Sequence, residues 1–148
     1  MSESLLSVRD LRVSFDTPDG VVKAVDGLSF DVQPGETVGI VGESGSGKSV
    51  TANAIMRLNF AQRVTTTGSI MLDGVDLLAV SDEAMRQHRG RDIAMIFQDP
   101  LSALNPFYTV GAQIGEAYLV HHPKASKADV RTVVMDALHK VEIGRAHV

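Results

Sequence analysis

The stretch Gly42-Glu43-Ser44-Gly45-Ser46-Gly47-Lys48-Ser49 matches the pattern G-x-x-x-x-G-K-[ST] at every fixed position, and it follows an apolar run at residues 37–41. This order predicts a buried strand that leads into the loop and a helix from Ser49 to about Asn59 behind it. Glycines are needed because backbone N–H groups must close on a polyphosphate without a Cβ in the way. The stretch therefore predicts a phosphate-binding loop in an α/β fold.

Two side chains at the end of this loop carry its expected chemistry. Lys48 would reach the β- and γ-phosphates of a nucleotide, and Ser49 would offer its hydroxyl to Mg²⁺. The helix that begins there points the positive end of its dipole at the same anions. The alternative is a glycine- and serine-rich loop that binds nothing, and the agreement of strand, loop and helix disfavours it.

Composition sets the class of protein in which this loop lies. The chain has 148 residues, 44% of them hydrophobic and 22% charged, which predicts one folded domain or part of one. A net charge of −4 without a basic patch argues against nucleic acid as a partner. The absence of cysteine excludes disulfides and thiolate metal sites. We find neither a signal peptide nor an apolar run of the roughly 18 residues that a membrane span needs.

The chain is expected to begin with β-structure and to end with helices. Turns are predicted at Pro18-Asp19-Gly20 and Asp73-Gly74. Ser81, Thr109 and Ser126 are candidate N-caps, the last in a capping box with Asp129. Strands are expected at residues 5–15, 21–25, 28–32, 37–41, 65–72 and 93–97, and helices at 49–59, 82–89, 110–120 and 127–141.

A second motif narrows the family. The run at residues 93–106, Ile-Ala-Met-Ile-Phe-Gln-Asp-Pro-Leu-Ser-Ala-Leu-Asn-Pro, resembles the Q-loop of ATP-binding-cassette (ABC) ATPases, and its F-Q-D-P-x-x-x-L-N-P form is similar to the oligopeptide/dipeptide permease branch. Residues 20–30 resemble the same branch. The resemblance covers nearly all of residues 5–141. It implies a P-loop NTPase of ABC type, with an N-terminal antiparallel β subdomain, part of a RecA-like core and the start of a helical subdomain.

The resemblance assigns roles to individual residues. Phe15 matches an aromatic that stacks on adenine, although an aromatic in a strand is often simply part of the core. Gln98 matches the glutamine that approaches Mg²⁺ and the attacking water, as an amide can without titrating. Thr51 would add a hydroxyl near the α-phosphate. The implied catalytic residues are Lys48 and Gln98, the metal ligands are Ser49 and Gln98, and the nucleotide contacts are Phe15, Gly42, Glu43, Ser44, Gly45, Ser46, Gly47, Lys48, Ser49 and Thr51.

The function that the resemblance implies is that of an ATP-binding subunit of an importer for peptides or related small solutes. ATP and Mg²⁺ are the implied cofactors. The implied partners are transmembrane permease subunits, a second ABC ATPase subunit, identical or different, and indirectly an extracytoplasmic solute-binding protein. The implied location is the cytoplasmic face of the bacterial inner membrane, as a peripheral subunit. The alternatives are a soluble ABC ATPase of the repair or translation type, and a truncated nucleotide-binding fragment without turnover.

Several parts of the family's hydrolytic machinery are not found in the sequence. No apolar run that ends in Asp-Glu follows Gln98, and there is no L-S-G-G-Q signature. We therefore expect an amino-terminal fragment without activity of its own, with residues 1–141 as a partial ABC domain whose helical part begins near residue 107. Residues 142–148 back-translate as (G)AG ATC GGA AGA GCA CAC GTC, the start of a common sequencing adapter. Our hypothesis is that this tail is an artefact.

Overall fold

The computed structural model describes residues 4–59, 63–99 and 104–142. It divides into two compact units, Met1–Arg89 and Gly90–Val148, which we describe separately. The expected boundary near residue 107 stays a prediction about the domains of the family. The last six residues, which make up nearly all of the proposed artefact tail, lie outside the described residues.

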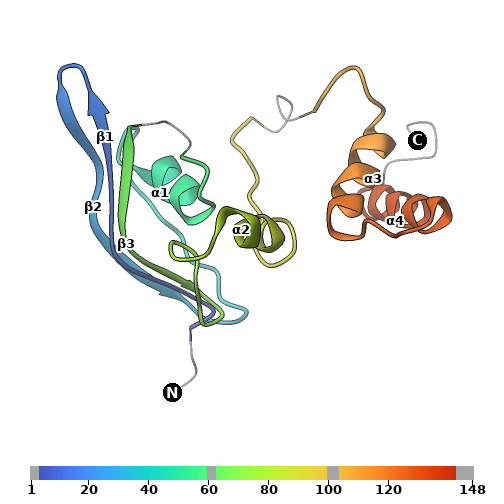
Figure 1. Cartoon of the computed structure of the whole chain (residues 1–148), viewed down its shortest axis with the longest axis horizontal. Helices are drawn as coiled ribbons and strands as arrows, with labels where there is room; N and C mark the ends of the chain where they lie inside the picture. Colours follow the sequence, from blue (N-terminus) through green and yellow to red (C-terminus); the bar gives the residue numbers. More distant parts are fainter. Residues whose placement is uncertain (1–3, 60–62, 100–103, 143–148) are drawn as a thin grey trace. The chain divides into compact units, whose positions relative to one another are not determined.

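The first unit is built on an antiparallel sheet with the strand order β2-β1-β3-β4 (Figure 1). Helix α1 lies on one side of this sheet, and α2 follows the short strand β4. The turns predicted at residues 18–20 and 73–74 join β1 to β2 and β3 to β4. The elements are β1 (Leu6–Thr17), β2 (Gly20–Val32), α1 (Lys48–Ile55), β3 (Val64–Leu72), β4 (Val75–Asp76) and α2 (Asp82–His88).

A bulge in β1 determines which side chains form the core. The register shifts between Val8 and Leu11, and Asp10 takes a φ of 44°. This extra residue brings Val8, Leu11 and Val13, which are all fully buried, to the same face of the sheet. Gly68 on β3 lies opposite the bulge with a φ of 106°, and a Cβ there would be 2.6 Å from the Asp10 carbonyl oxygen. The bulge therefore requires glycine on the neighbouring strand.

Three sequence predictions about this unit are wrong in detail. The two strands expected at residues 21–25 and 28–32 form one strand, β2, with Gly27 at a φ of 85° absorbing the irregularity. The helix expected to reach Asn59 ends at Ile55, because Arg57 adopts a left-handed φ of 50°. Residues 37–41, expected to be a buried strand, have no regular structure and are exposed.

The second unit contains a helical hairpin of α3 (Val110–His121) and α4 (Lys127–Lys140). Gly115 on α3 allows a close approach, because a Cβ there would be 2.9 Å from Cγ1 of Val130. Val134 and Leu138 on α4 are buried. The predicted caps are confirmed: Thr109 accepts from the Ala112 N–H, Ser126 and Asp129 form the capping box, and in the first unit Ser81 accepts from the Ala84 N–H.

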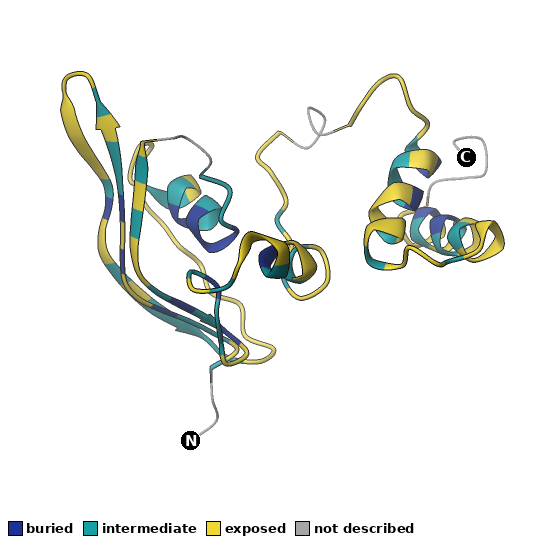
Figure 2. Ribbon diagram, in the orientation of Figure 1, coloured by how far each residue is buried: buried dark blue, intermediate teal, exposed yellow. Residues whose placement is uncertain are grey.

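The strand predicted at residues 93–97 does not form in this second unit. Ile93 makes one isolated bridge, and the residues behind it are irregular. Ile96 and Phe97 are exposed, and Figure 2 shows long exposed stretches outside the regular elements. A continuous apolar run becomes a strand only if other strands complete its hydrogen bonds and cover its faces. Among the described residues, no strand pairs with 37–41 or with 93–97.

Candidate functional site

The predicted phosphate loop leads directly into helix α1. Gly47 is the N-cap of this helix and adopts a left-handed φ of 86°. A Cβ on Gly47 would lie 2.4 Å from the carbonyl oxygen of Ala24 on β2. Glycine is therefore required at this position both for its φ and for the closeness of the β2 backbone.

The other two glycines of the loop have different roles. A Cβ on Gly42 would lie 2.4 Å from Oγ of Ser46, so its absence leaves room for that hydroxyl. Gly45 adopts a φ of 83° but faces open space. The Ser46 N–H donates to the Glu43 carbonyl at 3.2 Å, which closes the loop into a turn. Ser44, also expected to contact phosphate, is exposed within that turn.

Lys48 places its charge inside the turn of the loop. Its Nζ donates to the carbonyl oxygens of Gly42 at 2.6 Å and Glu43 at 2.7 Å, and to Oγ of Ser46 at 3.2 Å. These contacts use the three donors that an ammonium group has. The half-buried side chain is thus held as a point charge at the N-terminal end of α1, where anions are also favoured by the helix dipole.

The two hydroxyl residues behind Lys48 lie in different environments. Ser49 is exposed in the first turn of α1, where its hydroxyl is accessible from solvent. Thr51 is only 2% exposed, and its N–H donates to the Gly47 carbonyl at 2.8 Å. Thr51 is therefore part of the wall behind the loop, and its expected approach to a phosphate stays a prediction.

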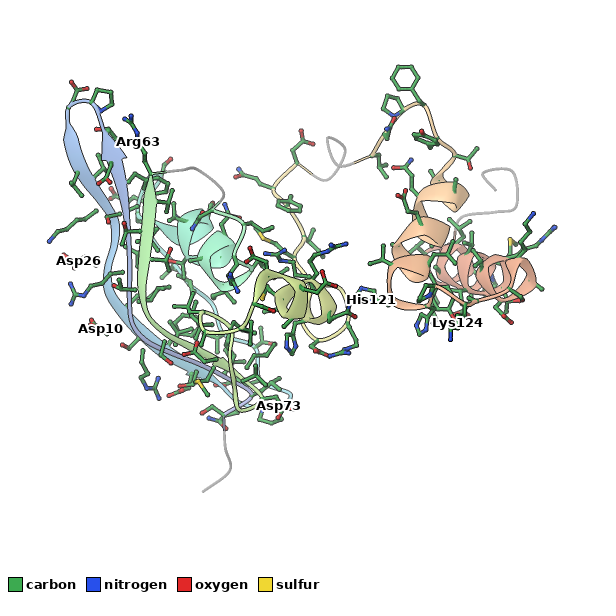
Figure 3. The ribbon with its side chains drawn as sticks, viewed as in Figure 1. Asp10, Asp26, Arg63, Asp73, His121 and Lys124 are labelled. Atoms are coloured by element: carbon green, nitrogen blue, oxygen red, sulfur yellow. The ribbon has the colours of Figure 1, made fainter. Side chains whose placement is uncertain are left out.

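A pocket of about 380 Å³ lies beside the loop. The carboxylate of Asp26 at its edge is paired with Arg12 and, at 3.6 Å, with Lys23. Figure 3 shows Asp26 and Asp10 beside one another along the β1–β2 side of the sheet. The hydrogen bond and charge of Asp10, and then the charge of Asp26, raise the pKa of Arg12. The pocket is lined by Ala24, Val25, Asp26, Gly27, Leu28, Ile40, Val41, Ser46, Lys48 and Thr51.

The contribution of β2 to this pocket could not be predicted from the sequence. Residues 24–28 belong to the stretch 20–30, which resembles the oligopeptide/dipeptide permease branch, but they contain no motif that indicates a binding site. Their place becomes visible once Gly47 is seen against Ala24. Phe15, predicted to stack on a base, does not line the pocket; it is half-buried on β1, where it pairs with Val22 and Val64.

Gln98 belongs to the second unit, Gly90–Val148, and is exposed. It follows the irregular residues 94–97 instead of a strand end. Part of the motif in which it lies, residues 100–103, falls outside the described residues. The predicted roles of Gln98 toward Mg²⁺ and water therefore stay predictions.

The described residues contain neither a candidate metal cluster nor a candidate membrane span. No group of three or more histidine and acidic side chains is arranged to hold a metal ion in the described part of the chain. No helix within residues 4–59, 63–99 and 104–142 combines the length and the apolar character of a membrane span.

Comparisons with known proteins identify a family and relatives of the chain. Residues 25–147 match the family model described as ABC transporter. The chain is 52% identical over 143 residues to the dipeptide transport ATP-binding protein DppD of Bacillus subtilis, which covers 95% of the chain and 42% of that protein. It is 47% identical over 141 residues to the oligopeptide transport ATP-binding protein OppD of Mycobacterium bovis. That alignment covers 95% of the chain and 23% of the relative. The chain thus spans less than half of either relative.

Solved structures support the fold. The ATP-binding cassette MJ0796, described as a dimer in a post-hydrolysis state bound to ADP and Pi, superposes with a TM-score of 0.78 at 20% sequence identity. The match covers 96% of this chain and 59% of that one. The predicted fold class, an ABC-type P-loop fold with an antiparallel β subdomain and helices, is thereby confirmed.

Proposed function

Because the chain belongs to the ABC transporter family, we propose that it forms part of the ATP-binding subunit of an importer for peptides or related small solutes. The names of the relatives in Bacillus subtilis and Mycobacterium bovis, which are dipeptide and oligopeptide transport ATP-binding proteins, support this class of solute. These names also favour a transport function over that of a soluble ATPase of the repair or translation type. The observation that carries the proposal is the Lys48 ammonium, held within the loop of residues 42–49 at the start of α1.

The described residues fit a nucleotide with Mg²⁺. Gly42 and Gly47 let the loop close tightly against Ser46 and β2, and Lys48 supplies a positive charge among backbone groups at a helix N-terminus. Bound ATP would supply the phosphoanhydride bond that is cleaved. On binding, Lys48 would exchange the Gly42 and Glu43 carbonyls for phosphate oxygens, and its charge would then offset the negative charge of the phosphates.

Other residues complete the proposed site. Ser49 would ligate Mg²⁺ through its exposed hydroxyl, and Gln98 would ligate the ion and orient water. Phe15 would stack on the adenine, and Thr51 would support the α-phosphate. Glu43, Ser44, Gly45 and Ser46 would surround the phosphates with their backbone.

The proposed partners follow from the transport role. Two such subunits would close around ATP, and the segment that carries Gln98 would pass the motion to transmembrane permease subunits at the cytoplasmic face of the inner membrane. A solute-binding protein would deliver the solute to the permease from the other side. The dimeric state of the MJ0796 cassettes supports the pairing of subunits.

We further propose that the 148-residue chain binds nucleotide without turning it over. The sequence after Gln98 contains no apolar run ending in Asp-Glu, so the acids that would hold Mg²⁺ and activate water in this family cannot be assigned. The chain is expected to release no phosphate above background. Release that disappears in Lys48→Ala would contradict this.

Titration with the fluorescent analogue trinitrophenyl-ATP tests nucleotide binding. We expect saturable binding that Lys48→Ala weakens about tenfold or more, because a charge-assisted contact to phosphate is lost. Lys140→Ala is a matched control, since Lys140 is an exposed lysine paired with Asp136 at 2.7 Å on α4. Equal affinity for the original chain and Lys48→Ala would refute the proposed site.

A further inference from the structure

Helix α1 is too short to hold its own position. It has 8 residues, fewer than the roughly 12–15 that an isolated helix needs for stability in water. Its geometry must therefore come from contacts with the rest of the first unit. Because a helix this short moves as one body, any shift of its C-terminal end carries Lys48, in its first turn, with it.

Arg89 binds the C-terminal end of this helix. Its Nε donates to the carbonyl oxygen of Met56 and its Nη2 to that of Arg57, both at 2.8 Å. Carbonyls at a helix C-terminus lack partners within the helix, and a positive charge there is favoured by the helix dipole. The planar guanidinium meets two successive carbonyls at once, which a lysine cannot do with the same geometry.

Arg57 makes the reverse connection, from the end of α1 to the segment that enters α2. Its Nη1 donates to the carbonyl oxygens of Val80 at 2.7 Å and Leu77 at 3.3 Å, and its Nη2 to Oδ1 of Asp82 at 2.5 Å. The left-handed φ of 50° at Arg57 turns the chain where α1 ends. The end of α1 is thus joined to the start of α2 by Arg57 and to the end of α2 by Arg89.

A cavity of about 400 Å³ borders both arginines, and its three arginines would suit an anion. The hydrogen bonds argue against that use. Arg57 and Arg89 already donate to backbone carbonyls and to Asp82, and Arg86 is paired with Glu83 at 3.3 Å. An anion would have to displace these partners, which favours a cross-link. The cavity is lined by Ala54, Arg57, Asn59, Thr66, Leu78, Asp82, Arg86 and Arg89.

We propose that Arg89 and Arg57 are positioning residues for the phosphate loop, which they orient by fixing the far end of α1 to the two ends of α2, Arg57 at its start and Arg89 at its C-terminal cap. The inference rests on the proposed function, since it concerns nucleotide binding at the same loop. Neither arginine lines the pocket beside the phosphate loop. Both act through the axis of the helix that carries Lys48.

The first test compares Arg89→Gln with Arg86→Gln in the 148-residue chain, at a temperature where circular dichroism shows each variant folded. Both changes remove one arginine charge beside the same cavity, but only Arg89 binds the end of α1. We expect Arg89→Gln to weaken trinitrophenyl-ATP binding about tenfold, and Arg86→Gln less than about twofold. A merely structural role would lower the melting temperature and leave the affinity of the folded protein unchanged, and that result would overturn the proposal.

The second test measures amide hydrogen exchange of residues 48–57 without nucleotide. Exchange there should be faster in Arg89→Gln than in Arg86→Gln, because α1 loses its anchor. Arg89→Lys keeps the charge but not the planar fork, so both its exchange and its affinity should be intermediate. It also provides the test if Arg89→Gln does not fold. Exchange and affinity in Arg89→Lys equal to those of the original chain would overturn the proposal.

The two proposals fail in different ways. If Lys48→Ala binds trinitrophenyl-ATP as well as the original chain does, the proposed nucleotide site is wrong. If the Lys48 effect is present but α1 exchanges at equal rates in the Arg89 and Arg86 variants, the nucleotide site stands and the positioning role is wrong.

Discussion

Apolar side chains lie in opposite environments in two kinds of segment of this chain. On β1, the side chains of Val8, Leu11 and Val13 are fully buried. Val41 and Ile96, in runs just as apolar, are 93% and 90% exposed. The difference is one of partners, since β1 is paired on both sides, whereas no strand among the described residues pairs with the other two runs. An apolar run indicates side chains that are stabilised by burial. Whether they are buried depends on another element that packs against them.

The largest expected effect separates these two environments directly. Leu11→Ala should lower the free energy of unfolding by about 2–5 kcal/mol, because it leaves a cavity in the packed face of the sheet. Val41→Ala should change it by less than about 0.5 kcal/mol, because nothing packs on that side chain. Urea denaturation of the two variants measures both values. Similar costs at the two positions would show that residues 37–41 are buried after all.

The phosphate loop lies between the exposed residues 37–41 and helix α1. Its glycines therefore allow the cost of a substitution to be compared between a packed and an open position. Gly47→Ala should cost more than the roughly 1–2 kcal/mol of left-handed backbone strain, because the new Cβ would also meet the Ala24 carbonyl. Gly45→Ala should cost the strain alone, since open space surrounds it. Thermal unfolding compares the two. Equal losses would contradict the contact between the loop and β2.

The start of α4 offers a case in which no distant partner is needed. Ser126→Ala should destabilise this helix by about 1 kcal/mol, because the capping box is lost. The hydrogen bond from the Ser126 hydroxyl lowers the pKa of Asp129 below its ordinary value near 3.8. The stabilisation is therefore present above that value and is lost as the pH falls through the lowered pKa.

Far-ultraviolet circular dichroism followed from neutral to acidic pH measures this effect. The difference in stability between the original chain and Ser126→Ala should begin to narrow below about pH 3.8, where the unfolded Asp129 takes up a proton, and should be lost once the pH has fallen through the lowered pKa of the folded state. A difference that stays constant down to strongly acidic pH would mean that the Asp129 carboxylate does not contribute.

The smallest effect on stability is expected where the side chains are most exposed. Combining Val41→Ser with Ile96→Ser should leave the free energy of unfolding within about 0.5 kcal/mol of the original. The same variant should associate less with itself, because exposed apolar patches promote association. Sedimentation velocity measures the association, and Val120→Ser, at an exposed position on α3, is the control. A marked loss of stability would show that the two runs are covered.

The sequence predicted most reliably those features that depend on neighbours in the chain. Ser81, Thr109 and Ser126 cap helices as expected, since a cap needs only the next three residues. The turn at Asp73-Gly74 has the two positive φ values of a tight hairpin turn. The phosphate loop also precedes a helix as predicted, because its glycine pattern specifies the local backbone.

Features that depend on distant residues were not predictable in this way. The early end of α1 coincides with the left-handed Arg57, whose carbonyl is bound by Arg89 from 32 residues away. The pocket beside Lys48 is lined in part by residues 24–28 of β2. No motif or spacing in the sequence indicates that this strand lies next to the loop. The strands expected at 37–41 and 93–97 were predicted from hydrophobicity alone, which does not report whether a partner strand is available.

The contact between Gly47 and the Ala24 carbonyl limits how this loop can be reused in protein engineering. The eight-residue motif is short enough to suggest that it could be transplanted alone between scaffolds. Here one wall of the loop belongs to β2, where the carbonyl of Ala24, 23 residues before Gly47, occupies the place of a missing side chain. A transplant that moved only residues 42–49 would leave that wall behind. The smallest portable unit would have to include the backbone of β2.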